Sequence, residues 1–219
     1  MEDSLLTTII AAVIFAVIMY FFRLLMNRLK GKAGEKTVAR MLRKLPKDQY
    51  IVMDDITIPT PRGSNQIDHL ILSVYGIFVL ETKNYTGWIY GSESGEYWTQ
   101  NIYSKKNQLY NPILQNAGHV RALRRILKDF EPLPYISIIA FSEKADLKVK
   151  VKEARVIYWG QIRDVIGSYD RKKLTWDQIL AIHDCVLSNQ LEPGRETNRE
   201  HIQNVRKIKK QKEQNYYGN

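Results

Sequence analysis

The longest apolar stretch of the chain lies at its N-terminus. Residues 4–22 carry no charge, and nineteen residues in an α-helix extend roughly 28 Å, close to the hydrocarbon thickness of a bilayer. A cleaved signal peptide has a basic start and a small-residue cleavage site. This segment instead follows Glu2 and Asp3 and ends at Phe22. We therefore predict an uncleaved transmembrane helix, and the alternative is a buried core helix.

Basic residues follow this apolar segment directly, at Arg23, Arg28, Lys30 and Lys32. Segments rich in Lys and Arg beside a transmembrane helix stay on the cytoplasmic side. We therefore predict that residues 1–32 anchor the protein in the cell membrane by a single pass. The N-terminus would lie outside the cell, and the C-terminal domain would lie in the cytoplasm.

Two apolar runs in the middle of the chain, residues 67–74 and 77–80, meet at Tyr75–Gly76 and are rich in β-branched and aromatic residues. This composition is typical of paired strands. Loop residues, 60–65, precede them. A domain over 33–192 and a polar tail over 193–219 are predicted. Within the domain, the apolar spacing predicts helices over 34–45, 111–130, 160–168 and 176–189, and strands over 50–58, 87–102, 135–141 and 154–159.

Three charges interrupt the central strands. Asp68 lies near the start of the first strand, and Glu81 and Lys83 lie at the end of the second, on one face because strand side chains alternate. Two carboxylates that strand pairing brings together repel each other unless a divalent cation lies between them, and oxygen ligands suit Mg²⁺ or Mn²⁺. The alternative is a solvated strand edge with a surface Glu81–Lys83 ion pair, which contributes little stability.

Composition narrows the range of partners. The net charge of +10 and the pI near 9.5 are consistent with binding to nucleic acid or to an anionic membrane surface. A single cysteine, Cys185, excludes an intrachain disulfide and a cysteine zinc cluster, and the four histidines have no metal-binding spacing. A basic cluster in the tail suits contact with phosphates or lipid headgroups, or a solvated segment; it consists of Arg206, Lys207, Lys209, Lys210 and Lys212.

Short motifs follow one another in a fixed order between residues 34 and 118. They are Gly34-Glu35 at the expected start of a helix, Gln66-Ile67-Asp68-His69, Gly76-Ile77-Phe78-Val79, Glu81-Thr82-Lys83-Asn84, Gly87, and Asn111-Pro112 followed by Gln115. This set resembles the nuclease-related domain (NERD), which is placed in the PD-(D/E)xK nuclease superfamily with restriction endonucleases and Holliday-junction resolvases. One position departs from the superfamily pattern, because Ile67 stands where a proline is usual. That proline is not a metal ligand.

The resemblance implies a restriction-endonuclease-like α/β fold, with a mixed β-sheet flanked by helices. It implies that Asp68, Glu81 and the Thr82 carbonyl hold Mg²⁺ or Mn²⁺ and that Lys83 acts on the attacking water. Glu35 would complete the metal environment or orient water, and Gln115 would position the backbone. The implied reaction is phosphodiester hydrolysis in DNA, with RNA as the less favoured substrate. The rival function is a non-catalytic, membrane-tethered module that binds nucleic acid or a protein partner.

Overall fold

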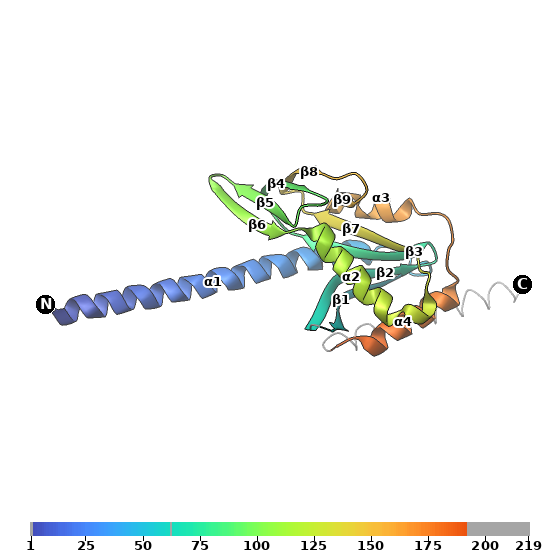
Figure 1. Ribbon diagram of the computed structural model, residues 1–219, viewed down its shortest axis with the longest axis horizontal. Coiled ribbons are helices and arrows are strands. Elements are labelled where there is room, and N and C mark those ends of the chain that lie inside the picture. Colours follow the sequence, from blue (N-terminus) through green and yellow to red (C-terminus); the bar gives the residue numbers. More distant parts are fainter. Residues whose placement is uncertain (1, 62, 192–219) are drawn as a thin grey trace, which may run out of the picture.

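The computed structural model describes residues 2–61 and 63–191 of the 219-residue chain. Its most prominent element is α1 (Glu2–Leu42), a single helix whose N-terminal part projects away from the rest of the chain (Figure 1). The large apolar side chains of that part are exposed, whereas Val38 and Leu42 near its C-terminal end are buried. Among the described residues, α1 is the one helix long and apolar enough to cross a membrane.

The main sheet has the order β1-β2-β3-β7-β9. The pairs β1–β2 and β2–β3 are antiparallel, whereas β7 and β9 continue parallel to β3. The sheet is therefore mixed, as predicted. Its strands are β1 (Tyr50–Thr60), β2 (Gly63–Ser73), β3 (Gly76–Lys83), β7 (Tyr135–Phe141) and β9 (Arg155–Tyr158).

Helices cover both faces of the main sheet. One face packs against α2 (Pro112–Ile126) and α4 (Trp176–Asn189) through residues such as Leu123 and Ile179. The other face packs against the end of α1 and against α3 (Ile162–Gly167) through Leu42 and Ile166. Two 3-10 turns, Lys128–Phe130 and Trp159–Gln161, follow α2 and β9. The predicted α/β class with a mixed sheet between helices is confirmed.

A second sheet, of order β6-β5-β4-β8, lies above the main sheet in Figure 1. Its inner face is apolar, and Trp98 stacks on Phe141 with ring centroids 6.1 Å apart. The sequence patterns predicted short strands over 87–102 but neither β6 nor β8, because both are largely polar and exposed. The four strands are β4 (Gly87–Ser92), β5 (Tyr97–Ile102), β6 (Lys105–Tyr110) and β8 (Ala145–Lys150).

Three expectations from the sequence differ from the structure. Gly34 does not begin a helix, because α1 passes without a break through the expected boundary between residues 32 and 33. The expected loop over 60–65 is shorter, because pairs such as Thr60–Gly63 extend the β1–β2 ladder into polar sequence. The helix that begins near Asn111 ends at Ile126. The predicted basic cluster of the tail lies outside the described residues.

Close packing joins α1 to the end of β3. A Cβ atom added at Gly34 would lie 2.8 Å from the Asn84 Cβ. One turn earlier in α1, the Lys30 carbonyl accepts a hydrogen bond of 2.8 Å from the Asn84 side chain. The absence of a side chain at Gly34 therefore allows the helix backbone to approach the sheet at this point.

We expect Gly34→Ala to destabilise the protein by about 1–3 kcal/mol, because the added methyl group forces α1 away from β3. Gly31→Ala is the matched control, since its Cβ would have no atom within 4 Å. It should stabilise the helix by roughly 0.5–1 kcal/mol through helix propensity. Thermal unfolding of the two full-length variants in detergent measures the difference, and an equal response to both substitutions would contradict the close contact.

Candidate functional site

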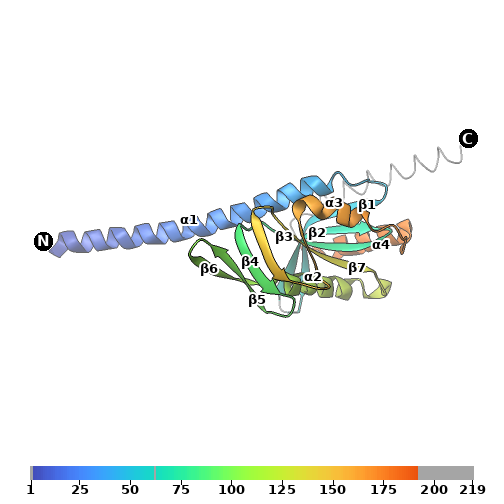
Figure 2. The ribbon, with the colours of Figure 1, turned by 90° about the horizontal axis from the view of Figure 1, so that it is seen from above.

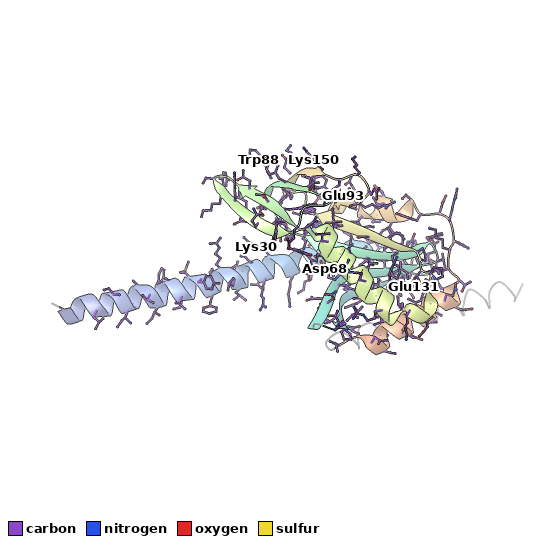
Figure 3. All side chains as sticks on the ribbon, in the orientation of Figure 1. Lys30, Asp68, Trp88, Glu93, Glu131 and Lys150 are labelled. Atoms are coloured by element: carbon purple, nitrogen blue, oxygen red, sulfur yellow. The ribbon has the colours of Figure 1, made fainter. Side chains whose placement is uncertain are left out.

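The site begins where β2 and β3 separate. Their ladder ends at the pair His69–Leu80. Beyond it, β2 continues to pair with β1, while β3 pairs with β7 as far as Lys83. Asp68 is the next residue of β2, and its Oδ2 accepts a hydrogen bond of 2.8 Å from the Thr82 backbone N–H. A side-chain carboxylate thus bridges the two strands at the point where their backbones part, close to where α1 joins the domain (Figure 3).

Glu81 lies on β3 beside this point and is buried. Its Oε1 accepts hydrogen bonds from Lys83 Nζ at 2.7 Å and from Gln115 Nε2 at 2.8 Å. Lys83 also donates to Gln115 Oε1 at 2.9 Å. The Lys83 ammonium is therefore held between a carboxylate and an amide oxygen, so its position is defined by two partners.

His119 also contacts Glu81, with 3.0 Å between Nε2 and Oε2. This residue is not among those predicted from the sequence, because the spacing of the histidines along the chain indicates no metal site. A signal was present: residues four apart share a face of a helix, and His119 lies four residues after Gln115 on α2. Gln115 and His119 therefore reach the same carboxylate from two successive turns.

Side-chain amides hold α2 in place over the site. Asn111 caps the helix by accepting from the Ile113 N–H at 2.9 Å, and Pro112 occupies the first helical turn, where its missing N–H costs nothing. Inside the helix, the buried Asn116 donates to the Val79 carbonyl and to the Ser137 hydroxyl, both at 2.8 Å. These bonds tie α2 to β3 and β7, and so place Gln115 beside Glu81.

Burial shapes the charges of the site. It raises the pKa of Asp68 to about 8, and the neighbouring Glu81 carboxylate adds to the effect. Burial also disfavours ionised Glu81, but the His119 hydrogen bond and the Lys83 ammonium outweigh it and lower the pKa of Glu81. For Lys83, burial is outweighed by Glu81, which raises the pKa of the ammonium. Neighbouring donors and the Lys83 ammonium thus stabilise the charged form of Glu81, whereas the charged form of Asp68 is not stabilised enough to offset burial.

Glu35 reaches the site from α1. It is half-buried, and burial followed by repulsion from Asp55 raises its pKa. Its charge also acts on Asp68 and Glu81. The structure thus brings Glu81, Lys83 and Gln115 into direct contact, places Asp68 beside them on the Thr82 amide, and holds Glu35 at electrostatic range.

The donor chemistry of the site fits a hard divalent cation. Asp68 and Glu81 supply carboxylate oxygens, the ligands that Mg²⁺ and Mn²⁺ prefer. An ionised carboxylate offers about four acceptor positions, and three on Glu81 are taken by Lys83, Gln115 and His119. One therefore remains for a cation. In the part of the chain that the structure describes, however, no three His, Cys, Asp or Glu side chains form a preassembled metal cluster.

Comparison with known proteins identifies the family of this chain. The model of the nuclease-related domain (NERD) family matches residues 30–142. The chain belongs to this family. The match begins at Lys30 within α1 and includes every site residue from Glu35 to Gln115, which is consistent with the PD-(D/E)xK nuclease superfamily.

An uncharacterized protein of Bacillus anthracis is 44% identical to this NERD protein over 162 residues, which cover 72% of this chain and 76% of that protein. No solved structure matches the chain.

The two carboxylates should respond oppositely to neutralisation in the absence of metal. Glu81→Gln leaves the buried Lys83 ammonium without its counter-charge, so we expect a loss of about 3 kcal/mol. With a folded-state pKa of about 8, Asp68 must take up a proton on folding at neutral pH, whereas Asn needs none and keeps an oxygen for the Thr82 amide. Asp68→Asn should therefore raise the unfolding free energy at neutral pH by on the order of 1 kcal/mol.

The pH dependence tests this assignment. Because the pKa of Asp68 is higher in the folded state than in the unfolded chain, the contribution of Asp68 to stability falls as pH rises from about 4 to about 8. The advantage of Asp68→Asn should therefore be absent near pH 4 and grow towards pH 8. Denaturant unfolding in EDTA measures it, and a constant difference across this range would contradict the assignment.

Proposed function

We propose that this NERD protein is a membrane-anchored, divalent-metal-dependent nuclease that hydrolyses phosphodiester bonds in DNA, with RNA less favoured. The observation that carries this proposal is the position of the Lys83 ammonium, 2.7 Å from Glu81 and 2.9 Å from Gln115, beside a second, partly buried carboxylate, Asp68. A surface ion pair is exposed to solvent, whereas the Glu81–Lys83 pair is largely shielded from it. The positive charge of Lys83 is therefore held beside two acidic groups, Glu81 and Asp68.

Each residue has a distinct task in the proposed reaction. Asp68, Glu81 and the Thr82 carbonyl would hold Mg²⁺ or Mn²⁺, and Glu35 would complete the negative environment. The bound cation would supply Lewis acidity towards a phosphate oxygen and acidify water. Lys83 would orient the attacking water and stabilise the charge that develops on the phosphate. Gln115 would hold the Lys83 ammonium and the Glu81 carboxylate in place by hydrogen-bonding to both.

His119 is a positioning residue in this proposal. Its ring hydrogen-bonds to Glu81, so its contribution would be to keep the Glu81 carboxylate ionised and oriented. A carboxylate that is held by a charged or polar partner on each oxygen has little freedom to rotate. Precise placement of such groups contributes strongly to catalysis.

The anchor follows from α1. Its exposed apolar N-terminal part would cross the cell membrane, and Arg23, Arg28, Lys30 and Lys32 would keep the domain on the cytoplasmic side. The proposed division of the chain is an anchor over residues 1–32, a nuclease domain over 33–192 and a tail over 193–219. Because Lys30 contacts Asn84, assays should use the full chain in detergent or nanodiscs.

We expect the full chain to cleave DNA only when Mg²⁺ or Mn²⁺ is present, and Asp68→Ala to abolish cleavage. Lys83→Gln should lower the cleavage rate by on the order of 10²–10³, because it removes a charge that acts in the transition state. Its effect on Mn²⁺ affinity should be much smaller. Rates on single-stranded, duplex and branched DNA, together with calorimetric Mn²⁺ titrations, provide the measurement.

Lys148→Gln is the matched control, because this exposed lysine pairs with Asp146 on the second sheet. It should cleave like the wild type. An equal loss of metal affinity and rate in Lys83→Gln would assign the lysine to the metal environment. If the wild type bound DNA without cutting any of these substrates, the non-catalytic binding module would replace the proposed nuclease.

Membrane topology is tested by cysteine labelling. Lys172→Cys in a Cys185→Ser background places one thiol at an exposed position of the domain. An impermeant maleimide added to intact cells should not label it until the membrane is broken. Labelling of intact cells would place the domain outside the cell and would rule out a cytoplasmic substrate.

A further inference from the structure

The turn between β5 and β6 carries aromatic and basic side chains at one end of the second sheet. Tyr103, in this turn, is 97% exposed, and Lys105 and Lys106 follow it at the start of β6. Trp88 on β4 is 50% exposed. Asn101 pairs with both Trp88 and Lys106, so these two side chains share the outer face. We call Trp88, Tyr103, Lys105 and Lys106 the hairpin tip.

The charge of this region has one sign. Residues 97–110, which form the whole β5–β6 hairpin, contain two lysines and no acidic residue. Across the sheet, Asp146 pairs with Trp88 in the β4–β8 ladder and forms an ion pair with Lys148 at 3.1 Å. Aromatic side chains with a polar edge, accompanied by lysines, are the residues that favour a membrane–water interface.

Contacts place the hairpin tip close to the level of Lys30 on α1. Asn84 holds the Lys30 carbonyl, and the Thr86 carbonyl accepts from Gln100 at 2.9 Å. Gly87, with a φ of 79°, packs closely against the Asn101 carbonyl. The start of β4 therefore links α1 to the end of β5, from which the turn extends further.

The direction of the turn completes the geometry. In both views it points to the side on which the N-terminal part of α1 leaves the domain (Figures 1 and 2). From Lys30 to Phe22, where the apolar segment ends, a helix rises about 12 Å. Two residues of strand beyond Asn101 extend roughly 7 Å. The Tyr103 side chain thus comes near the level at which α1 would enter the hydrocarbon.

We infer that the hairpin tip is a second membrane contact, which rests on the headgroup layer of an anionic bilayer beside α1. This inference depends on the proposed membrane anchor. A single helix leaves the domain free to tilt relative to the membrane, whereas a second contact through the second sheet restricts this tilt. Lys105 and Lys106 face anionic headgroups together with Arg28, Lys30 and Lys32, and Tyr103 and Trp88 enter the interface.

The contact of the hairpin tip with the bilayer also fixes how the proposed active site is oriented relative to the membrane. The segment that links the site to the hairpin tip is short, because only Asn84, Tyr85 and Thr86 separate Lys83 from β4. Fixing the tip on the bilayer therefore fixes the Asp68–Glu81 pair relative to the membrane plane. Nucleic acid would then approach the site from one direction.

Fluorescence quenching in vesicles tests this contact with the full chain. A single cysteine in a Cys185→Ser background carries an environment-sensitive dye at Ser104, in the turn, at Lys172, on an exposed loop between α3 and α4, or at Ile14, in the apolar part of α1. The vesicles contain phosphatidylcholine with or without phosphatidylglycerol, and a spin-labelled lipid is the quencher.

We expect strong quenching at Ile14 in both lipids and, at Ser104, quenching several-fold above Lys172 that increases with phosphatidylglycerol. The quenching of the dye at position 104 should fall by half or more when Tyr103→Ser, Lys105→Gln and Lys106→Gln are added. Tyr97→Ser is the matched control, because this tyrosine is 56% exposed at the opposite end of the hairpin. It should leave the signal unchanged.

The remaining outcomes separate the inference from the anchor. Quenching at Ile14 with a Ser104 signal no larger than that of Lys172 would overturn the hairpin contact and leave the anchor intact. Absence of quenching at Ile14 would remove the anchor and the contact together. A Ser104 signal that ignores phosphatidylglycerol but responds to a single-stranded oligonucleotide would overturn the inference in favour of base stacking on the aromatic residues.

Discussion

The separation of β2 from β3 is the constraint on which the site depends. Up to His69–Leu80 the two strands satisfy each other's backbone groups, and beyond it each turns to its other neighbour. A buried backbone N–H without a partner is costly, and at Thr82 the Asp68 carboxylate supplies that partner. The hydrogen bond to the Thr82 N–H therefore holds the Asp68 carboxylate inside the domain, beside Glu81 on the adjacent strand.

The buried Glu81 carboxylate stays ionised because surrounding groups stabilise its charge. Glu81 has Lys83, Gln115 and His119 as donors, and α2 can present two of these because Asn116 holds it against the sheet. Asp68 has one backbone donor and two acidic neighbours. The imbalance leaves an excess of negative potential, which is the physical basis for expecting a cation here.

The long helix α1 connects this chemistry to the N-terminal apolar segment. Gly34 lets the helix approach Asn84, the Lys30 carbonyl is bonded there, and Glu35 adds its charge to the site. The same helix continues without a break into the exposed apolar part. Any tilt of the helix in a bilayer would therefore be transmitted to the site, since no flexible linker lies between them in the described residues.

Local patterns along the chain were sufficient for much of this structure. The length of the apolar run over residues 4–22 predicted a helix there. The spacing of apolar residues predicted the helix at Trp176–Asn189 and the central pair of strands, because each of these elements turns one apolar face to the core. The motifs around Asp68, Glu81, Lys83 and Gln115 were sufficient for the family. Alternation also placed Glu81 and Lys83 on one face, and the structure has them in contact.

Tertiary structure decided what depends on a partner distant in sequence. Strands β6 and β8 are polar, and they are strands because β5 and β4 offer them backbone partners. His119 carries no metal-site pattern, and it joins the site because α2 crosses β3. The sequence placed two acids near each other, but only the fold made Glu81 compensated and Asp68 under-compensated, because burial and hydrogen bonding are properties of the assembled surroundings and not of the residues themselves.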